Sequence, residues 1–219
     1  MNNFFVSNLC IYKPSPENLA EMPKLEFCDP LFKRRLSQIS RMTIQVVHEL
    51  IQKVPQAKNF KLVFCSFRGE LARQLKINKS LYEDADIMPA SFSISVFNTP
   101  PAAATISEGI KAGYSAVYPA NDSFYDGLIS AVAPVLSEYE KNIIFVYADE
   151  FIIDEYKSAF KPVNAHDSAQ PLAFACLLSA SKLSGTDTAT QSAEFKLSDL
   201  KNIHSPQDFL ELLQTTTTE

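Results

Sequence analysis

Residues 88–99, MPASFSISVFNT, and residues 118–127, YPANDSFYDG, are the stretches that decide the fold predicted from this sequence. The segment between them has helical composition up to Gly113, followed by a short apolar run that is typical of a strand. In the second stretch, Asn121 and Asp122 are of the two residue types whose side chains commonly accept hydrogen bonds from the free N–H groups at the start of a helix. The two stretches therefore predict a helix, a strand and a second helix in succession.

Outward from these stretches, strand-like and helix-like segments alternate along the chain. The strand-like runs are short and rich in β-branched and aromatic residues, and the helix-like segments carry apolar residues at helical spacing. This alternation predicts an α/β fold built in layers, with a mixed sheet that is largely parallel. The expected strands are residues 4–12, 60–66, 114–118, 142–148, 171–180 and 193–197, and the expected helices are residues 29–54, 69–82, 102–112, 123–139 and 206–213.

Two of the helices carry further expectations. The helix over residues 29–54 is expected to be continuous, with Asp29 as its N-cap, Pro30 at its first position and Pro55 directly after its end. The helix over residues 69–82 is expected to bury one face against the rest of the fold. The leucines available for that inner face are Leu71, Leu75 and Leu81.

Size and charge bound the class of protein. A chain of 219 residues, 46% of them hydrophobic, buries roughly 70% of the surface that its unfolded form exposes, so we expect one domain over residues 1–219. A Ser/Thr-rich loop at about residues 179–192 is expected to be mobile, and a tail at about residues 214–219 to be disordered. The net charge of -5 argues against binding to nucleic acid or an anionic membrane, because such binding needs clustered Lys and Arg. The one basic cluster, residues 33–35 with Arg41, is expected to be solvated or to contact a partner.

No metal site, cofactor site or disulfide framework is predicted. The four cysteines, at positions 10, 28, 65 and 176, show no C-x-x-C pairing and no histidine at ligand spacing. The N-terminus lacks the pattern of a signal peptide, and no apolar run is long enough to span a bilayer. We therefore expect a cytoplasmic protein with reduced thiols.

Five stretches in order resemble the N-terminal half of a β-ketoacyl synthase of the thiolase superfamily. The resemblance is to the short ketosynthase-like proteins of aryl-polyene and related type II fatty-acid or polyketide gene clusters, and it covers about residues 29 to 180. It implies a thiolase-like half as the fold. The stretches are residues 29–41, 63–73, 89–106, 120–127 and 144–150.

The same resemblance implies that the catalytic nucleophile is absent. Catalytic members of the family place a cysteine at the start of a buried helix, and this sequence has Asn121 at that position. They also use two histidines from the C-terminal half, and the histidines of this chain, at positions 48, 166 and 204, do not fit that role. We therefore expect a non-catalytic chain-length factor that pairs with a catalytic ketosynthase, with an acyl carrier protein as a further partner.

The resemblance also implies where this subunit meets its partner. The segment before the nucleophile strand is expected to lie at the dimer interface and to reach toward the acyl pocket. If it is extended, its bulky apolar side chains alternate with small hydroxyls, and if it is helical, the division between them is less clean. The interface and pocket candidates are Ser91, Phe92, Ile94, Val96, Phe97 and Asn98.

Two alternatives remain open. Ser123 with His166 and a nearby acid is a candidate nucleophile for a stand-alone acyl-thioester hydrolase or transferase, although its surroundings lack the G-x-S-x-G turn. A stand-alone acyl-binding module is the other alternative. Because a lone ketosynthase half is expected to leave apolar surface uncovered, we favour association with a partner.

Overall fold

In the computed structural model, the structure describes residues 3–119, 123–152, 154–157, 170–182 and 192–216. Its centre is a six-stranded mixed sheet with the strand order β3-β2-β4-β5-β1-β6. The pairs β2–β3 and β2–β4 are parallel, whereas β4–β5, β1–β5 and β1–β6 are antiparallel. The strands are β1 (Asn3–Tyr12), β2 (Lys61–Cys65), β3 (Tyr114–Val117), β4 (Asn142–Asp149), β5 (Leu172–Ser179) and β6 (Ala193–Lys196).

The predicted α/β fold with a mixed sheet is confirmed, and all six expected strands are present. The parallel part is smaller than expected, because it is confined to β3, β2 and β4. The antiparallel part comes from β1 and β5, which run beside each other in opposite directions. Every residue of β5 is buried, and its sequence is a nearly continuous apolar run. Because parallel strands buried on both faces show the same pattern, the sequence did not reveal that β5 is antiparallel.

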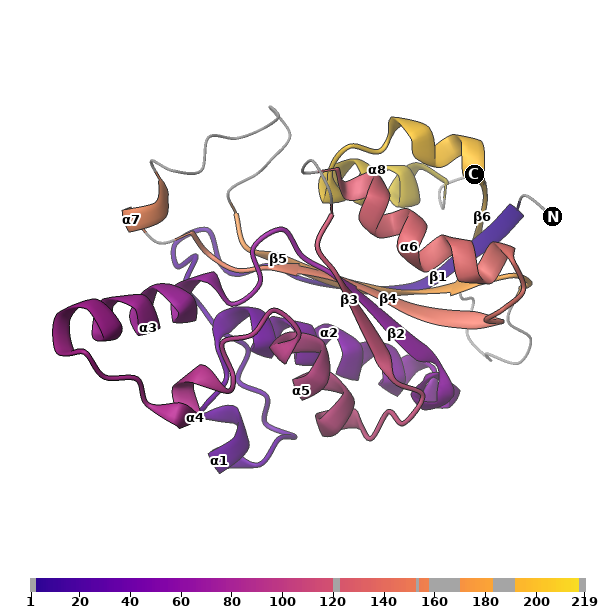
Figure 1. Ribbon diagram of the computed structural model, residues 1–219. Helices are drawn as coiled ribbons and strands as arrows, with labels where there is room; N and C mark the ends of the chain where they lie inside the picture. The colour runs from indigo at the N-terminus through magenta and orange to yellow at the C-terminus, as the bar shows by residue number, and fades with distance from the viewer. Residues whose placement is uncertain (1–2, 120–122, 153, 158–169, 183–191, 217–219) are drawn as a thin grey trace.

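Helices cover both faces of the sheet (Figure 1). On one face, α2 lies against the strands and α5 packs on α2; on the other face lie α6 and α8. The α-helices are α1 (Pro30–Lys33), α2 (Gln38–Lys53), α3 (Leu71–Asp84), α4 (Pro89–Phe92), α5 (Thr99–Glu108), α6 (Phe124–Leu136), α7 (Asp154–Lys157) and α8 (Pro206–Thr216), and the 3-10 helices are η1 (Pro55–Asn59) and η3 (Leu197–Asn202).

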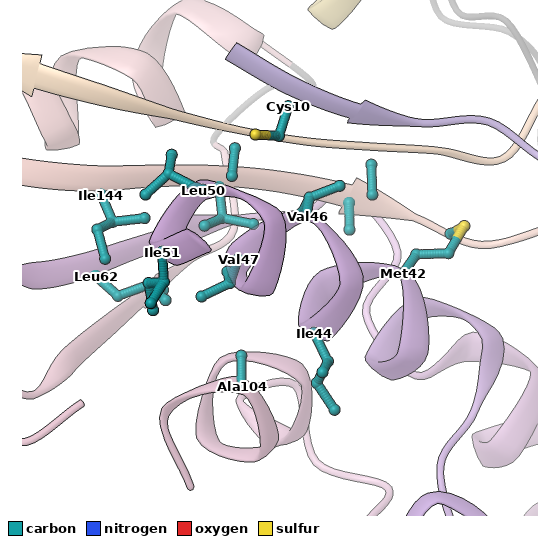
Figure 2. Packing of buried hydrophobic residues seen from close by; sticks show 14 of the residues in the cluster. Cys10, Met42, Ile44, Val46, Val47, Leu50, Ile51, Leu62, Ala104 and Ile144 are labelled. Atoms are coloured by element: carbon teal, nitrogen blue, oxygen red, sulfur yellow. The ribbon is translucent and has the colours of Figure 1, made fainter. Parts of the chain in front are cut away.

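Each face of the sheet has its own hydrophobic core. Figure 2 shows the α2 side, where Val46, Leu50 and Ile51 of α2 belong to one cluster with Ile144 of β4, and Ala104 lies below them on α5. The opposite core is rich in aromatic rings, with Phe124 of α6 at its centre. The Phe124 ring lies within 6.4 Å of four other ring centroids, which join α6 and α8 to the sheet. These contacts hold the start of α6 firmly in place.

The single helix expected over residues 29–54 is wrong: the chain forms α1 and α2 with a turn between them. Asp29 caps α1 as expected, because its side chain accepts from the backbone N–H groups of Leu31 and Phe32. Ser37 then caps α2 by accepting from the N–H of Ser40. A second good N-cap inside the predicted helix therefore lets the chain turn and start again.

Three further expectations need correction. None of the 14 residues of α3, all of them described, is buried, so its predicted inner face is wrong. Helix α5 ends at Gly109, whose φ of 69° suits a left-handed cap, and not at Gly113. Residues 214–216, expected in a disordered tail, belong to α8, whereas residues 217–219 and most of the Ser/Thr-rich loop lie outside the described residues.

Gly127 allows α6 to lie close to the end of β2. A Cβ atom at this position would come within 2.3 Å of the Cys65 sulfur, which is closer than any packed contact. We expect Gly127→Ala to lower the free energy of unfolding by about 1–3 kcal/mol because of this overpacking. Chemical denaturation of the variant, alone and in a Cys65→Ala background, measures the effect. The loss should shrink when the sulfur is removed, and an equal loss in both backgrounds would contradict this contact.

Candidate functional site

The candidate site lies at the carboxyl ends of β2 and β4, where a buried carboxylate organises the chain. Asp149, at the end of β4, is 1% exposed. It accepts hydrogen bonds from the Ser66 hydroxyl at 2.7 Å, from the Arg68 N–H at 3.0 Å and from the Phe67 N–H at 3.3 Å. The Tyr147 hydroxyl donates at 2.5 Å, and the Arg68 guanidinium lies 3.9 Å away. These bonds fix the loop that leaves β2.

Burial raises the pKa of Asp149 above its ordinary value, while Arg68 and the hydrogen bonds act in the opposite direction. Burial also raises the pKa of the Tyr147 hydroxyl, and the neighbouring Asp149 adds to that shift. The carboxylate therefore needs every one of its donors. Removing one partner from such a buried group is costly, because the charge is then left without compensation.

The loop held by Asp149 contains Gly69, which lies against the predicted interface segment and has no side chain to displace it. Gly69 has a φ of 58°, and a Cβ atom there would lie 2.7 Å from the Phe97 ring. The Phe97 ring packs edge-on against Phe64 at 6.1 Å and against Tyr118 at 6.2 Å. Phe97 therefore anchors segment 88–99 to the ends of β2 and β3.

Segment 88–99 is not extended, so the helical case, in which apolar side chains and hydroxyls divide less cleanly, applies to it. Residues 89–92 form α4, and turns follow. The hydroxyls of Ser93 and Ser95 bond back to the carbonyls of Ala90 and Phe92, which stabilises the turned backbone. Ser95 is buried.

The structure brings three of the six predicted interface and pocket residues together. Phe92, Val96 and Phe97 line an open groove of about 420 Å³ together with α3 residues, among them Ile77. Phe92 is 56% exposed and Val96 44% exposed. Asn98 points elsewhere, because its side-chain amide donates to the Tyr114 hydroxyl at 2.9 Å.

The remaining two predicted residues, Ser91 and Ile94, are half-buried and do not line that groove.

The nucleophile region is only partly described. Asn121 and Asp122 lie outside the described residues, as does His166, the proposed base for Ser123. Ser123 lies at the N-cap of α6, where its side chain makes no capping hydrogen bond. The predicted N-caps of this helix and the Ser123 hydrolase therefore stay predictions.

The cysteines are all free and buried. Burial raises the pKa of the thiols of Cys10, Cys65 and Cys176, and the nearby Asp149 adds to the shift at Cys65. A thiol with a raised pKa is a poor nucleophile at neutral pH. Within the described ranges, no cluster of three His, Cys, Asp or Glu side chains could hold a metal ion.

Of the three histidines, His48 has a clear structural role. Its Nδ1 lies 3.1 Å from Glu108 and so joins α2 to α5, and Phe27 stacks on its ring. His204 follows η3, and its backbone N–H donates to Asp208. Neither of them lies in the groove or the acid network described above.

A second acid network, missed by the sequence analysis, adjoins the first. Glu150 is 2% exposed and accepts from the Ala72 N–H at 2.8 Å, at the start of α3. Glu70 is fully buried and accepts from the hydroxyls of Ser37 and Ser40 and from Arg73. The sequence signal for this network is the pair Asp149 and Glu150, directly after the strand predicted over residues 142–148. A buried acid at the end of a strand needs hydrogen-bond partners.

Comparisons with known proteins give the family. Residues 12–219 match the family model described as the N-terminal domain of β-ketoacyl synthase. The chain therefore belongs to the β-ketoacyl synthase family through this domain. A comparison with curated proteins finds no match.

Solved structures share the fold. A ketosynthase, ApeO, in complex with its chain length factor, ApeC, from Xenorhabdus doucetiae gives a match with a TM-score of 0.66 and 23% identity, covering 80% of this chain and 78% of that one. The ishigamide ketosynthase/chain length factor matches with a TM-score of 0.57 and 12% identity, covering 80% and 55%. The complex AntDE:AntF, a type II acyl-carrier protein with its ketosynthase, matches with a TM-score of 0.62 and 9% identity, covering 82% and 63%.

This chain thus spans less than two thirds of the matched chain in the last two structures. The matches confirm the predicted thiolase-like fold of a ketosynthase half. Within the described part of the chain, no helix is long and apolar enough to cross a membrane.

The buried Glu150 predicts a pH dependence of stability. Burial raises its pKa to about 7, with the neighbouring Glu70 and Asp149 adding to the shift. A carboxyl group whose pKa is raised by folding contributes stability below its unfolded pKa, and this contribution is lost as the pH rises through about 7. We expect the free energy of unfolding of Glu150→Gln to rise relative to that of the wild type between pH 5 and pH 8, by at most about 3 kcal/mol.

Urea denaturation of both proteins at each pH measures this gain. Glu26→Gln, at an exposed position, is the control and should follow the wild type. A gap between Glu150→Gln and the wild type that does not change with pH would contradict a titrating Glu150.

Proposed function

We propose that this chain is a non-catalytic ketosynthase-like subunit, a chain length factor. It forms a heterodimer with a catalytic β-ketoacyl synthase and shapes its acyl pocket in polyene or fatty-acid-like biosynthesis. The observation that carries the proposal is segment 88–99, in which Phe97 is anchored while Phe92 and Val96 face solvent. An acyl carrier protein is a further partner of the complex.

An apolar surface around this segment supports the proposal. It is called the α3–α4 patch here and consists of exposed side chains of α3, α4 and the turns beside them. Leu81 follows Ile77 of the groove by one helical turn, so both lie on the same face of α3. Exposed apolar surface of this kind marks sites of association. The patch residues are Leu81, Tyr82, Met88, Phe92 and Val96.

The edge of the sheet beside the patch also supports association. β3 is the last strand on its side, and it pairs with β2 alone among the described strands. Its outer N–H and C=O groups are therefore available to a partner chain. Tyr118, which directly follows β3, is 60% exposed and contacts Phe97. The end of β3 and the segment thus meet at this ring contact.

The match to the solved Xenorhabdus doucetiae complex fits the same role. It covers nearly equal shares of the two chains, so the matched chain is about as long as this one. That structure pairs a ketosynthase with its chain length factor.

The experiment that tests the heterodimer is co-expression with the ketosynthase encoded beside this chain. Size-exclusion chromatography with light scattering should give a one-to-one complex in which condensing activity needs the partner's own nucleophile. Because a charge in a buried apolar interface is costly, Phe92→Glu with Val96→Glu should abolish the complex. Tyr139→Glu is the matched control, since Tyr139 is 81% exposed at the opposite end of the sheet. A monomer that ignores the ketosynthase would reject the proposal.

The pocket-shaping role predicts a change of product. Phe92→Ala should lengthen the product of the partner enzyme, because a smaller side chain leaves more room for the acyl chain. Phe97→Ala should act in the same direction and also lower stability by about 2–4 kcal/mol, since its ring is an anchor. Product lengths are measured by mass spectrometry on the reconstituted complex. Unchanged lengths in both variants, with the heterodimer intact, would count against pocket lining.

A further inference from the structure

A second open pocket lies between the N-terminal ends of α2 and α3, apart from the α3–α4 patch. We call it the α2–α3 pocket; its volume is about 330 Å³, at the lower end of the range for small-molecule sites. Ala20, Met22 and Phe151 contribute apolar lining, and Arg73 and Lys76 of α3 contribute cations. It lies beyond the carboxyl end of β4, where ligands commonly bind in α/β folds.

The walls of this pocket are held by one buried amide. The Gln38 side chain is 5% exposed and donates to the carbonyls of Leu19 at 2.6 Å and Glu21 at 2.8 Å. Its oxygen accepts from the Phe151 N–H at 2.8 Å. Gln38 therefore ties the loop that carries Ala20 and Met22 to the segment after β4. A pocket whose walls are fixed in advance loses little entropy when a ligand enters.

The pocket carries two cationic side chains, Arg73 and Lys76, although the chain as a whole carries -5. Arg73 donates to Glu70 at 3.0 Å and to the Arg35 carbonyl at 2.7 Å, so it is held rigidly at the rim. Lys76 is exposed one turn further along α3, and no acidic partner is found for it among the described residues. Arg34 and Arg35 are exposed in the turn before α2. The basic cluster noted in the sequence thus extends to this mouth.

We propose that the α2–α3 pocket binds a small amphiphilic anion, with its apolar tail against Ala20, Met22 and Phe151 and its anionic head at Lys76 and Arg73. The lining suits this combination, because it joins four apolar side chains with two cations that both come from α3. Its other members are Ser37, Gln38 and Glu150. An unbranched fatty carboxylate is the simplest ligand of this chemistry. The site needs no partner chain, so it is independent of the proposed heterodimer.

Glu150 makes such binding depend on pH. It lines the pocket, and the charged groups around it are Glu70, Asp149, Arg73 and the more distant Lys76. Its pKa of about 7 means that the carboxyl group is neutral below neutral pH and negative above it. A bound anion repels the ionised form only, so binding takes up a proton. The affinity for an anion should therefore rise as the pH falls.

The first experiment is isothermal titration calorimetry of the purified full chain with octanoate at pH 6. Lys76→Glu should weaken binding at least fivefold, and Lys111→Glu, at an exposed position after α5, should leave it unchanged. Octan-1-ol, which has the same tail without the charge, should bind at least fivefold more weakly than octanoate. Ala20→Phe, which fills the pocket from an exposed loop position, should also weaken binding.

The second experiment follows the pH. From pH 6 to pH 8 the affinity of the wild type for octanoate should fall about tenfold, the change that one pKa unit of coupling gives. Glu150→Gln should bind octanoate with an affinity that hardly changes over this range. Absence of octanoate binding, equal affinities of Lys76→Glu and Lys111→Glu, or equal affinities for octanoate and octan-1-ol would each overturn the proposal. Because no ketosynthase is present, these outcomes are separate from those that test the heterodimer.

Discussion

The arrangement of the functional surface depends on the hydrogen bonds of one buried carboxylate, Asp149. A single carboxylate has two oxygens, and here they gather a hydroxyl of the same strand and two successive backbone N–H groups of the loop after β2. The loop leads directly to Gly69, on which Phe97 rests. The position of the exposed segment thus depends on a carboxyl group that is almost completely buried. Without this carboxyl group, the donors of residues 66–68 would lose their acceptor. The loop would then no longer hold Gly69 against Phe97.

In this arrangement a rigid support carries an exposed apolar surface. Phe97 packs edge-on against two aromatic rings, while Phe92 and Val96 are exposed on a turned backbone. A partner can therefore meet bulky apolar side chains that are already oriented, which lowers the entropy lost on association. Ile77 of α3 lines the same groove, and none of the 14 residues of this helix is buried. An amphipathic helix without a core to cover is well suited to an interface.

Two neighbouring acids at the end of β4 have different partners and different consequences. Asp149 is compensated by a guanidinium and by several donors, so its role is to fix the backbone. Glu150 has fewer compensating groups and a like charge at Glu70 nearby, and its pKa of about 7 places its titration near neutral pH. Asp149 thus fixes the loop after β2, whereas Glu150, in the lining of the α2–α3 pocket, changes its charge near neutral pH.

The sequence by itself determined the six strands, the α/β class and the family, because strand-like runs and motif spacing are local properties of the chain. It also singled out Phe92, Val96 and Phe97, but it left open whether their backbone is extended or helical. The structure decides this, because the hydroxyls of Ser93 and Ser95 bond back to carbonyls and stabilise a turned chain.

Only the tertiary structure decided which strands run antiparallel, which helix stays exposed and where the buried acids find their partners. Asp149 and Ser66 are far apart in the sequence, and the donors of a buried carboxylate follow from strand pairing, which periodicity does not contain. Local patterns fix which segments form, whereas the contacts between distant segments fix the site.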